Sequence, residues 1–251
     1  GLGKEKSFIN ISASFQLRSQ TARAGFDGDT RQEFTGYNAI ERVALTKGID
    51  INSYFGNINN TTASNQSALI SAIKTYAPEV SYFTPAQQTA ISSAASISQM
   101  QTALNFNNTD QEIAARGLTR RNFNQKVGQS SLTSTQVFVN AAYPVSKNSE
   151  LYAFGGYSNR NGAAAGNYRR PSTSNSTTAV YPNGFLPEIH SEITDISGAF
   201  GLRGKVFENW NYDLSNTYGK NSFGFIVENS INASLGKVSP STFDSGKLSF
   251  A

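Results

Sequence analysis

Residues 7–18 alternate strictly between apolar and polar side chains, a pattern that few folds can accommodate. The apolar positions are Ile9, Ile11, Ala13, Phe15 and Leu17, and the polar positions are Asn10, Ser12, Ser14, Gln16 and Arg18. Successive side chains of a β-strand point to opposite faces, so this segment is predicted to be a strand with one apolar face. Its length exceeds the roughly five or six residues of a common globular strand and matches the ~9–11 residues that cross a bilayer at a tilt. We therefore expect a strand that spans a membrane.

The same alternation recurs further along the chain. It is clear in residues 136–145, 196–206 and 210–218, and weaker in residues 151–157 and 223–227. Two pairs of these segments are joined by very short connections, residues 146–150 and residues 207–209. Antiparallel strands can be joined by such tight turns, whereas parallel strands cannot. The sequence therefore predicts an all-β fold built from antiparallel hairpins.

Two long connections contrast with these tight turns. They cover residues 19–130 and residues 162–193. Outer-membrane barrels have short periplasmic turns and long extracellular loops. The asymmetry therefore predicts part of a large antiparallel transmembrane β-barrel, in which both long connections are extracellular loops.

The first long loop carries helical signals. Residues 69–76 are apolar at a helical spacing, and residues 84–87 (Thr-Pro-Ala-Gln) are typical of a helix start. An apolar stripe follows over residues 90–104. Residues 109–112 (Thr-Asp-Gln-Glu) form a second capping-box pattern, and Gly117 is a suitable helix stop. We expect two or three short helices in this loop.

The composition excludes several other classes of protein. The longest unbroken apolar run, residues 151–154, is far short of the roughly 20 residues of a membrane-spanning helix. A net charge of +4 without a dense basic cluster argues against nucleic acid as a partner. With no Cys and with His190 as the one histidine, the chain offers neither disulfides nor a zinc or thiolate site. No nucleophile elbow, P-loop or dinucleotide fingerprint is present, so no enzyme activity, metal or cofactor is predicted.

Candidate contact residues fall into two groups. The second long loop contains Pro and Gly, which fix turns, together with aromatic and basic residues suited to ligand contact. Its candidates are Arg169, Arg170, Tyr181, Asn183 and Phe185. The alternative for the aromatic ones is that they anchor the loop to the rim of the barrel. The second group is predicted to face the barrel lumen, and consists of Asn10, Ser12, Gln16, Arg203 and Asp213. Arg203 and Asp213 are expected to pair with each other.

The opposite face of the same strands is predicted to contact lipid. Its expected members are Ile9, Ile11, Phe15, Val137, Val139, Phe200 and Leu202. Outer-membrane lipid is therefore a predicted partner of the chain.

Several stretches, in order along the chain, resemble the barrel region of TonB-dependent outer-membrane receptors of Gram-negative bacteria. They are residues 6–12, 115–120, 150–157, 181–189, 210–216, 229–236 and 239–243. The resemblance implies a barrel of roughly 22 strands with an N-terminal plug inside it. It also implies import of a scarce nutrient such as a metal chelate, vitamin, glycan or peptide, energised through TonB.

The resemblance implies partners that residues 1–251 do not contain. We expect a plug domain and the remaining barrel strands, on the same polypeptide or elsewhere, and the TonB complex acting through that plug. A surface lipoprotein covering the barrel is a further partner that the family allows.

Two alternatives stay open from the residues alone. One is a non-transporting outer-membrane surface protein, such as an adhesin or a structural barrel, whose long loops bind a partner. The other is a secreted β protein that binds carbohydrate.

Overall fold

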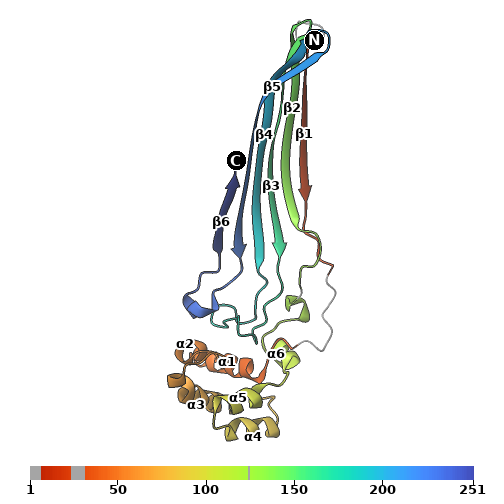
Figure 1. The fold of residues 1–251 in the computed structure, drawn as a ribbon. Helices are drawn as coiled ribbons and strands as arrows, with labels where there is room; N and C mark the ends of the chain where they lie inside the picture. Colours follow the sequence, from red (N-terminus) through yellow and green to blue (C-terminus); the bar gives the residue numbers. More distant parts are fainter. Residues whose placement is uncertain (1–6, 24–31, 124) are drawn as a thin grey trace.

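The computed structural model describes residues 7–23, 32–123 and 125–251, and it consists of a tall curved sheet with a group of helices at one end (Figure 1). The sheet has six strands in chain order, and each is antiparallel to its neighbours. They are β1 (Phe8–Arg18), β2 (Ser131–Ser146), β3 (Ser149–Ala165), β4 (Glu188–Val206), β5 (Trp210–Glu228) and β6 (Phe243–Phe250). Within the described residues the sheet is open, with β1 and β6 at its edges. The predicted antiparallel sheet is confirmed.

The connections divide between the two ends of the sheet, as the sequence predicted. At one end, here the turn end, residues 147–148 and 207–209 make tight turns. At the other, the loop end, lie the long connections: residues 19–130, 166–187 and 229–242 (Figure 1). Residues 162–165 and 188–193 were expected in the second loop but belong to β3 and β4. That loop is therefore residues 166–187, and His190 lies on a strand.

The strands also extend further than the alternation indicated. Residues 223–227 are the end of β5 and not a separate strand, and β6 was not predicted at all. In the added part of β3, Ser158 and Asn159 place polar groups on opposite faces, as do Arg160 and Asn161. Backbone pairing continues through this region, but the sequence carries no apolar period that would reveal it.

The helices lie between β1 and β2 and form what is here called the helical module, residues 36–123. They are α1 (Gly36–Thr46), α2 (Ile51–Phe55), α3 (Gln66–Tyr76), α4 (Pro85–Ser93), α5 (Ile97–Leu104) and α6 (Thr109–Ala115). Short 3₁₀ segments accompany them: η1 (Ala63–Asn65), η2 (Ala77–Glu79) and η3 (Arg120–Phe123); a further one, η4 (Ala233–Val238), lies between β5 and β6. The prediction of two or three helices was too low. None of the helices in the described residues is long and apolar enough to span a bilayer.

The helix starts and stops are partly as predicted. Thr84 caps α4 with a full capping box, and Gly117 follows the end of α6 with φ +64°. The prediction of a second capping box starting at Thr109 was wrong, because Asn108 is the N-cap of α6. The Thr109 hydroxyl instead accepts hydrogen bonds from the backbone N–H groups of Glu33 and Phe34, at 2.9 and 3.2 Å. The expected single stripe over 90–104 is divided between α4 and α5, because Ser96 caps a new helix.

The buried apolar core of the molecule is in the helical module. Leu69, Ile73 and Met100 are 0% exposed there. In the sheet, by contrast, Phe15 is 69% and Leu214 76% exposed. Monomeric soluble proteins rarely leave large contiguous apolar surfaces uncovered. The sheet thus has an apolar surface that nothing in the described chain covers.

The strand register places the predicted residues on two faces. Ile11 pairs with Val139, which pairs with Gly155, which pairs with Gly198, so these four positions share one face. All the residues expected to contact lipid lie on this apolar face; they are Ile9, Ile11, Phe15, Val137, Val139, Phe200 and Leu202. All the residues expected to face the lumen lie on the other, polar face; they are Asn10, Ser12, Gln16, Arg203 and Asp213. The two-sided pattern is confirmed.

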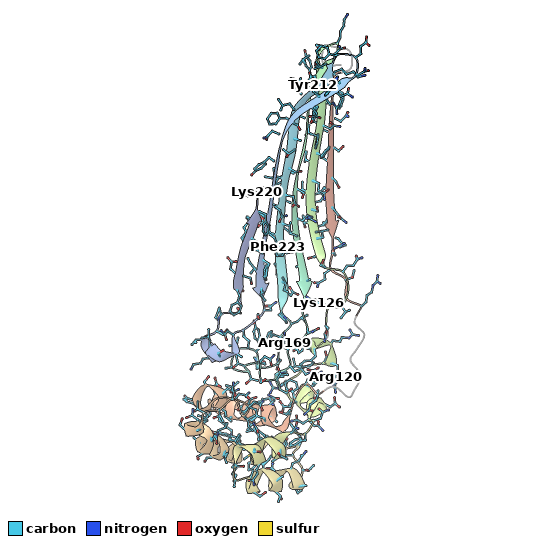
Figure 2. All side chains as sticks on the ribbon, in the orientation of Figure 1. Arg120, Lys126, Arg169, Tyr212, Lys220 and Phe223 are labelled. Carbon is cyan, nitrogen blue, oxygen red and sulfur yellow. The ribbon has the colours of Figure 1, made fainter. Side chains whose placement is uncertain are left out.

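The apolar face is apolar only over part of its height. On β4 the band runs from Ile196 to Val206. Below it on the same face, towards the loop end, come Thr194, Glu192 and His190. Aromatic residues stand at both margins of this apolar band: Trp210, Tyr212 and Tyr143 near the turn end, and Tyr157 and Tyr218 on the side of the loop end. Figure 2 shows Tyr212 at the turn end and Lys220, which pairs with Ile196 at the margin of the band, about midway along the sheet.

Candidate functional site between the helical module and the 166–187 loop

The 166–187 loop folds back on itself. The backbones of Arg169 and Phe185 exchange two hydrogen bonds, at 2.7 and 3.0 Å, and Phe185 is buried. The ring of Tyr181 stacks on that of Phe185 at 4.7 Å. Gly184 has φ +80°, and a Cβ at this position would come within 2.3 Å of the Arg169 carbonyl oxygen. Only glycine fits there, and the close approach lets the two arms of the loop pair.

Aromatic and cationic contacts fix this loop to the helical module. The Tyr168 ring meets Phe123 edge-on at 5.7 Å, and Phe123 meets Phe34 in the same way at 5.6 Å. The Arg116 guanidinium lies 4.6 Å from the centre of the Phe34 ring. It also donates to the Asn183 side-chain oxygen at 3.1 Å and to the backbone carbonyl of Pro182 at 3.1 Å. Loop and module are therefore held together by contacts that link distant parts of the chain.

A buried carboxylate, Glu112, anchors the same region. Its side chain is 0% exposed and accepts hydrogen bonds from Arg42 at 2.8 and 3.0 Å and from Arg116 at 2.7 Å. Tyr82 donates a further bond through its hydroxyl. Burial alone raises the pKa of Glu112, but the hydrogen bonds from Arg42 and the charge of Arg116 outweigh it and hold the pKa below its usual value. Glu112 is therefore a charged, paired group.

A second buried carboxyl, Glu41, contacts the loop directly. Asn38 and the Thr178 hydroxyl each donate to it at 2.8 Å, and Asn52 donates as well. Burial outweighs these bonds and the nearby charge of Arg116, and it raises the pKa of Glu41 to about 7. Glu41 thus differs from Glu112 because no arginine pairs with it at hydrogen-bond distance among the described contacts.

Replacing Glu41 by Gln is expected to remove a pH dependence of stability. The folded pKa lies above the unfolded one, so this group stabilises the fold fully below pH 4.5 or so and loses that contribution as the pH rises through about 7. The difference between the folded and unfolded pKa values corresponds to about 3 kcal/mol in the free energy of unfolding. Urea unfolding of the helical module, followed by pulse proteolysis at pH 5 and pH 8, measures it.

In that experiment the wild type should be less stable at pH 8, and E41Q should lose this slope. The control is Glu79→Gln, whose carboxylate is exposed and should leave the wild-type slope unchanged. Equal slopes in the wild type and E41Q would contradict the assignment.

The five predicted loop residues have different surroundings. Phe185 is buried, and the ring of Tyr181 stacks on it within the loop. Asn183 is held by Arg116, and Arg170 lies 3.9 Å from Glu33. The side chain of Arg169 is exposed, and Figure 2 shows it between the sheet and the helical module. These five residues therefore do not line a common pocket. Asn183 and Arg170 instead attach the 166–187 loop to the helical module and the residues just before it.

The predicted pair Arg203 and Asp213 is only partly as expected. The two residues are direct neighbours in the register of β4 and β5. Arg203, however, forms a salt bridge with Glu150 at 2.7 Å. Asp213 instead accepts a hydrogen bond from the Tyr152 hydroxyl at 2.9 Å, and the Arg203 guanidinium lies 4.9 Å from the centre of that tyrosine ring. Glu150 stands opposite Arg203 on the other neighbouring strand, β3.

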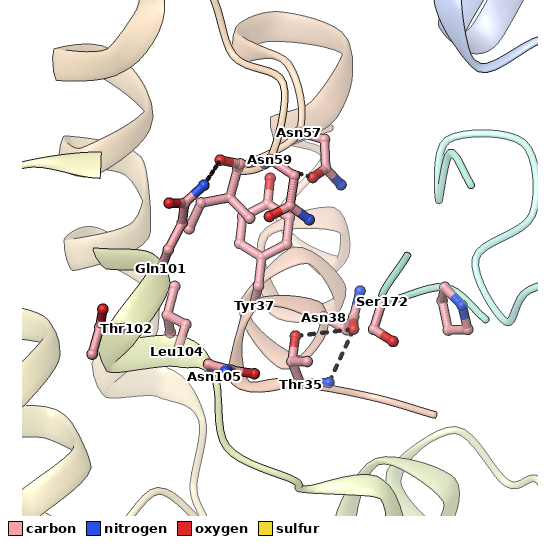
Figure 3. A pocket seen from close by; sticks show the side chains of 12 residues that line it. Thr35, Tyr37, Asn38, Asn57, Asn59, Gln101, Thr102, Leu104, Asn105 and Ser172 are labelled. Atoms are coloured by element: carbon pink, nitrogen blue, oxygen red, sulfur yellow. Dashed lines mark hydrogen bonds between the residues drawn. The ribbon is translucent and has the colours of Figure 1, made fainter. Parts of the chain in front are cut away.

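A polar pocket opens where the loop meets the module (Figure 3). Its volume is ≈ 390 Å³, within the usual ~300–1,000 Å³ of ligand sites. Twelve residues line it: Thr35, Tyr37, Asn38, Asn57, Ile58, Asn59, Gln101, Thr102, Leu104, Asn105, Pro171 and Ser172. None of them is charged. The sequence analysis singled out none of these residues; the cluster of Asn at 57, 59 and 60 was the available signal, but only the fold brings it next to α5 and the loop.

No group of three or more His, Asp or Glu side chains in the described part of the chain is placed to hold a metal ion. Comparisons with protein families, with curated proteins and with solved structures find no match to this chain. The physical features of the sheet and of the pocket are therefore the basis for a function.

Proposed function

We propose that this chain is a segment of a transmembrane β-barrel in the outer membrane of a Gram-negative bacterium, and that the complete barrel imports a scarce nutrient energised through TonB. The observation that carries the proposal is the apolar band on one face of the sheet. Outer-membrane barrels present to lipid an apolar band about 25 Å tall with aromatic girdles at both interfaces.

The dimensions of the band fit a bilayer. From Ile196 to Val206 there are ten residue steps, and at ~3.3 Å each they span about 33 Å along the strand. A tilt of about 40° reduces this to about 25 Å along the membrane normal. Trp210 and Tyr218 on β5 would lie at the two interfaces, where amphipathic aromatic rings are favoured.

The opposite face suits a water-filled or plugged interior. Ser158 and Arg160 both bond to Asp195 there, at 3.1 and 3.0 Å, and Arg203 bonds to Glu150. These groups would be costly in lipid but are satisfied beside water or a plug. The polar face is therefore assigned to the lumen.

The open edges of the sheet add a requirement. Each backbone group left unpaired in lipid costs several kcal/mol. The proposal therefore needs further strands beside β1 and β6, and it needs a plug through which the TonB complex acts. A surface lipoprotein would meet the barrel at the loop end.

The test follows the complete receptor in its own bacterium. Fractionation should place it in the outer membrane, and protease added to intact cells should cut the helical module while sparing the sheet. Cells lacking the gene should fail to take up one nutrient class at limiting concentration, and a protonophore should reproduce that failure. Outer-membrane location with unaffected uptake would favour an adhesin or structural barrel, and recovery without detergent would favour a secreted carbohydrate-binding protein.

A further inference from the structure

We propose that the pocket between the helical module and the 166–187 loop binds a short neutral saccharide. This inference rests on the proposed function in that the pocket would face the medium outside the cell. It goes further by naming the chemical class of the ligand, and the binding itself can be measured on solubilised receptor.

The lining of the pocket contains five side-chain amides and no charged group. Three segments of the module supply the walls: the start of α1, the residues after α2, and the end of α5 (Figure 3). Pro171 and Ser172 of the loop close the remaining side. A charged ligand would lose its hydration without gaining a counter-charge, which is unfavourable. The neutral lining therefore favours a neutral ligand.

Some of these amides are already committed to the fold. Asn38 accepts from the Thr35 backbone N–H at 3.0 Å and donates to Glu41, so both ends of its amide are used. Gln101 donates to the Ile58 carbonyl at 2.9 Å, which leaves its oxygen open. The side-chain oxygen of Asn57 accepts from the Asn59 backbone, which leaves its NH₂ group open. The committed bonds hold these open groups in place.

Other polar groups are entirely open. Among the hydrogen bonds of the described residues, none involves the side-chain amides of Asn59 and Asn105 or the hydroxyl of Ser172. An amide offers two donors and an acceptor, and a hydroxyl offers both functions. The open set therefore contains donors and acceptors around one cavity.

This mixture of open groups matches a sugar ring better than a peptide. Each sugar hydroxyl both donates and accepts, and neighbouring hydroxyls can bond to the N–H and C=O of one amide. A peptide would also need apolar subsites for its side chains. The apolar lining is limited to Ile58, Leu104 and Pro171 beside the Tyr37 ring, and Leu104 and Tyr37 are themselves buried in the module core.

The experiment uses the complete receptor in detergent and saturation-transfer difference NMR. The probes are four neutral hexasaccharides (maltohexaose, cellohexaose, xylohexaose and mannohexaose), with hexagalacturonate and hexaglycine as comparators. At least one neutral hexasaccharide should bind at millimolar concentration or below, and neither comparator should bind as tightly. Failure of all four neutral probes, or tighter binding of either comparator, would overturn the inference.

Matched variants locate the binding site. Asn59→Leu with Asn105→Leu removes two exposed amides from the pocket and should weaken binding at least tenfold. Gln111→Leu removes an exposed amide on α6, outside the pocket, and should leave binding unchanged. Binding that survives the pocket variants would also overturn the inference. Saccharide binding by a protein that is not in the outer membrane would overturn the importer proposal instead, so the two failures are distinguishable.

Discussion

Replacing Glu112 by Gln should destabilise the helical module by about 3–5 kcal/mol, the cost of breaking a buried ion pair by removing one partner. Glu112 is 0% exposed and neutralises two arginines, Arg42 and Arg116. The amide would leave these two like charges facing each other in a partly buried site. Arg116 also reaches Asn183, so the attachment of the 166–187 loop should loosen together with the module. Urea unfolding read by pulse proteolysis measures the loss.

The control is a salt bridge at the surface of the same module. Lys47 and Glu79 lie 3.0 Å apart, but their side chains are 54% and 43% exposed. Exposed ion pairs contribute about 0–1 kcal/mol, so Glu79→Gln should have little effect. Similar losses of stability in the two variants would show that burial does not determine the importance of Glu112.

Val139→Arg should prevent assembly of the chain into the outer membrane far more than Asn140→Arg does. Val139 lies within the apolar band, paired with Ile11 and Gly155. An arginine on the lipid face at the bilayer midplane costs about 2–4 kcal/mol. The adjacent side chain, Asn140, lies on the polar face, where in the proposed barrel the same arginine would meet water or the plug. The measurement is the fraction of each variant that is folded in the outer membrane, followed by its resistance to protease.

These two substitutions introduce the same arginine at adjacent positions of one strand, so the added side chain and the added charge are the same. The face of the sheet that receives the arginine differs between them. Equal tolerance of both variants would contradict the assignment of the apolar face to lipid, and with it the proposed barrel.

The face assignment could be predicted from the sequence because it follows from alternation alone. The apolar and polar positions of residues 7–18 fall on opposite faces in the structure, as do those of β2, β4 and β5. The tight turns were predictable for a related reason, since the alternation stops where the chain reverses.

The strand that the sequence analysis missed, β6, lacks a regular alternation of apolar and polar residues. In β6 the pairing with β5 shifts between Gly224 and Ile226, and Gly246 has φ +88°, so Phe243 and Leu248 follow no regular alternation. The candidate pocket could not be predicted because its walls come from segments far apart in the sequence. Arg203 was assigned to Asp213 because only one of its two neighbouring strands was considered, whereas Glu150 stands on the other.

The strands of the sheet continue well past the apolar band, and in the proposed barrel this would set the distance between the pocket and the lipid. On β4, residues 188–195 lie between the band and the 166–187 loop, and eight residues at ~3.3 Å extend about 26 Å along the strand. With the band in the bilayer, this stretch would act as a stalk that lifts the binding surface clear of the lipid headgroups. A bulky polymer could then be captured by one of its ends while the rest of it stays in free solution.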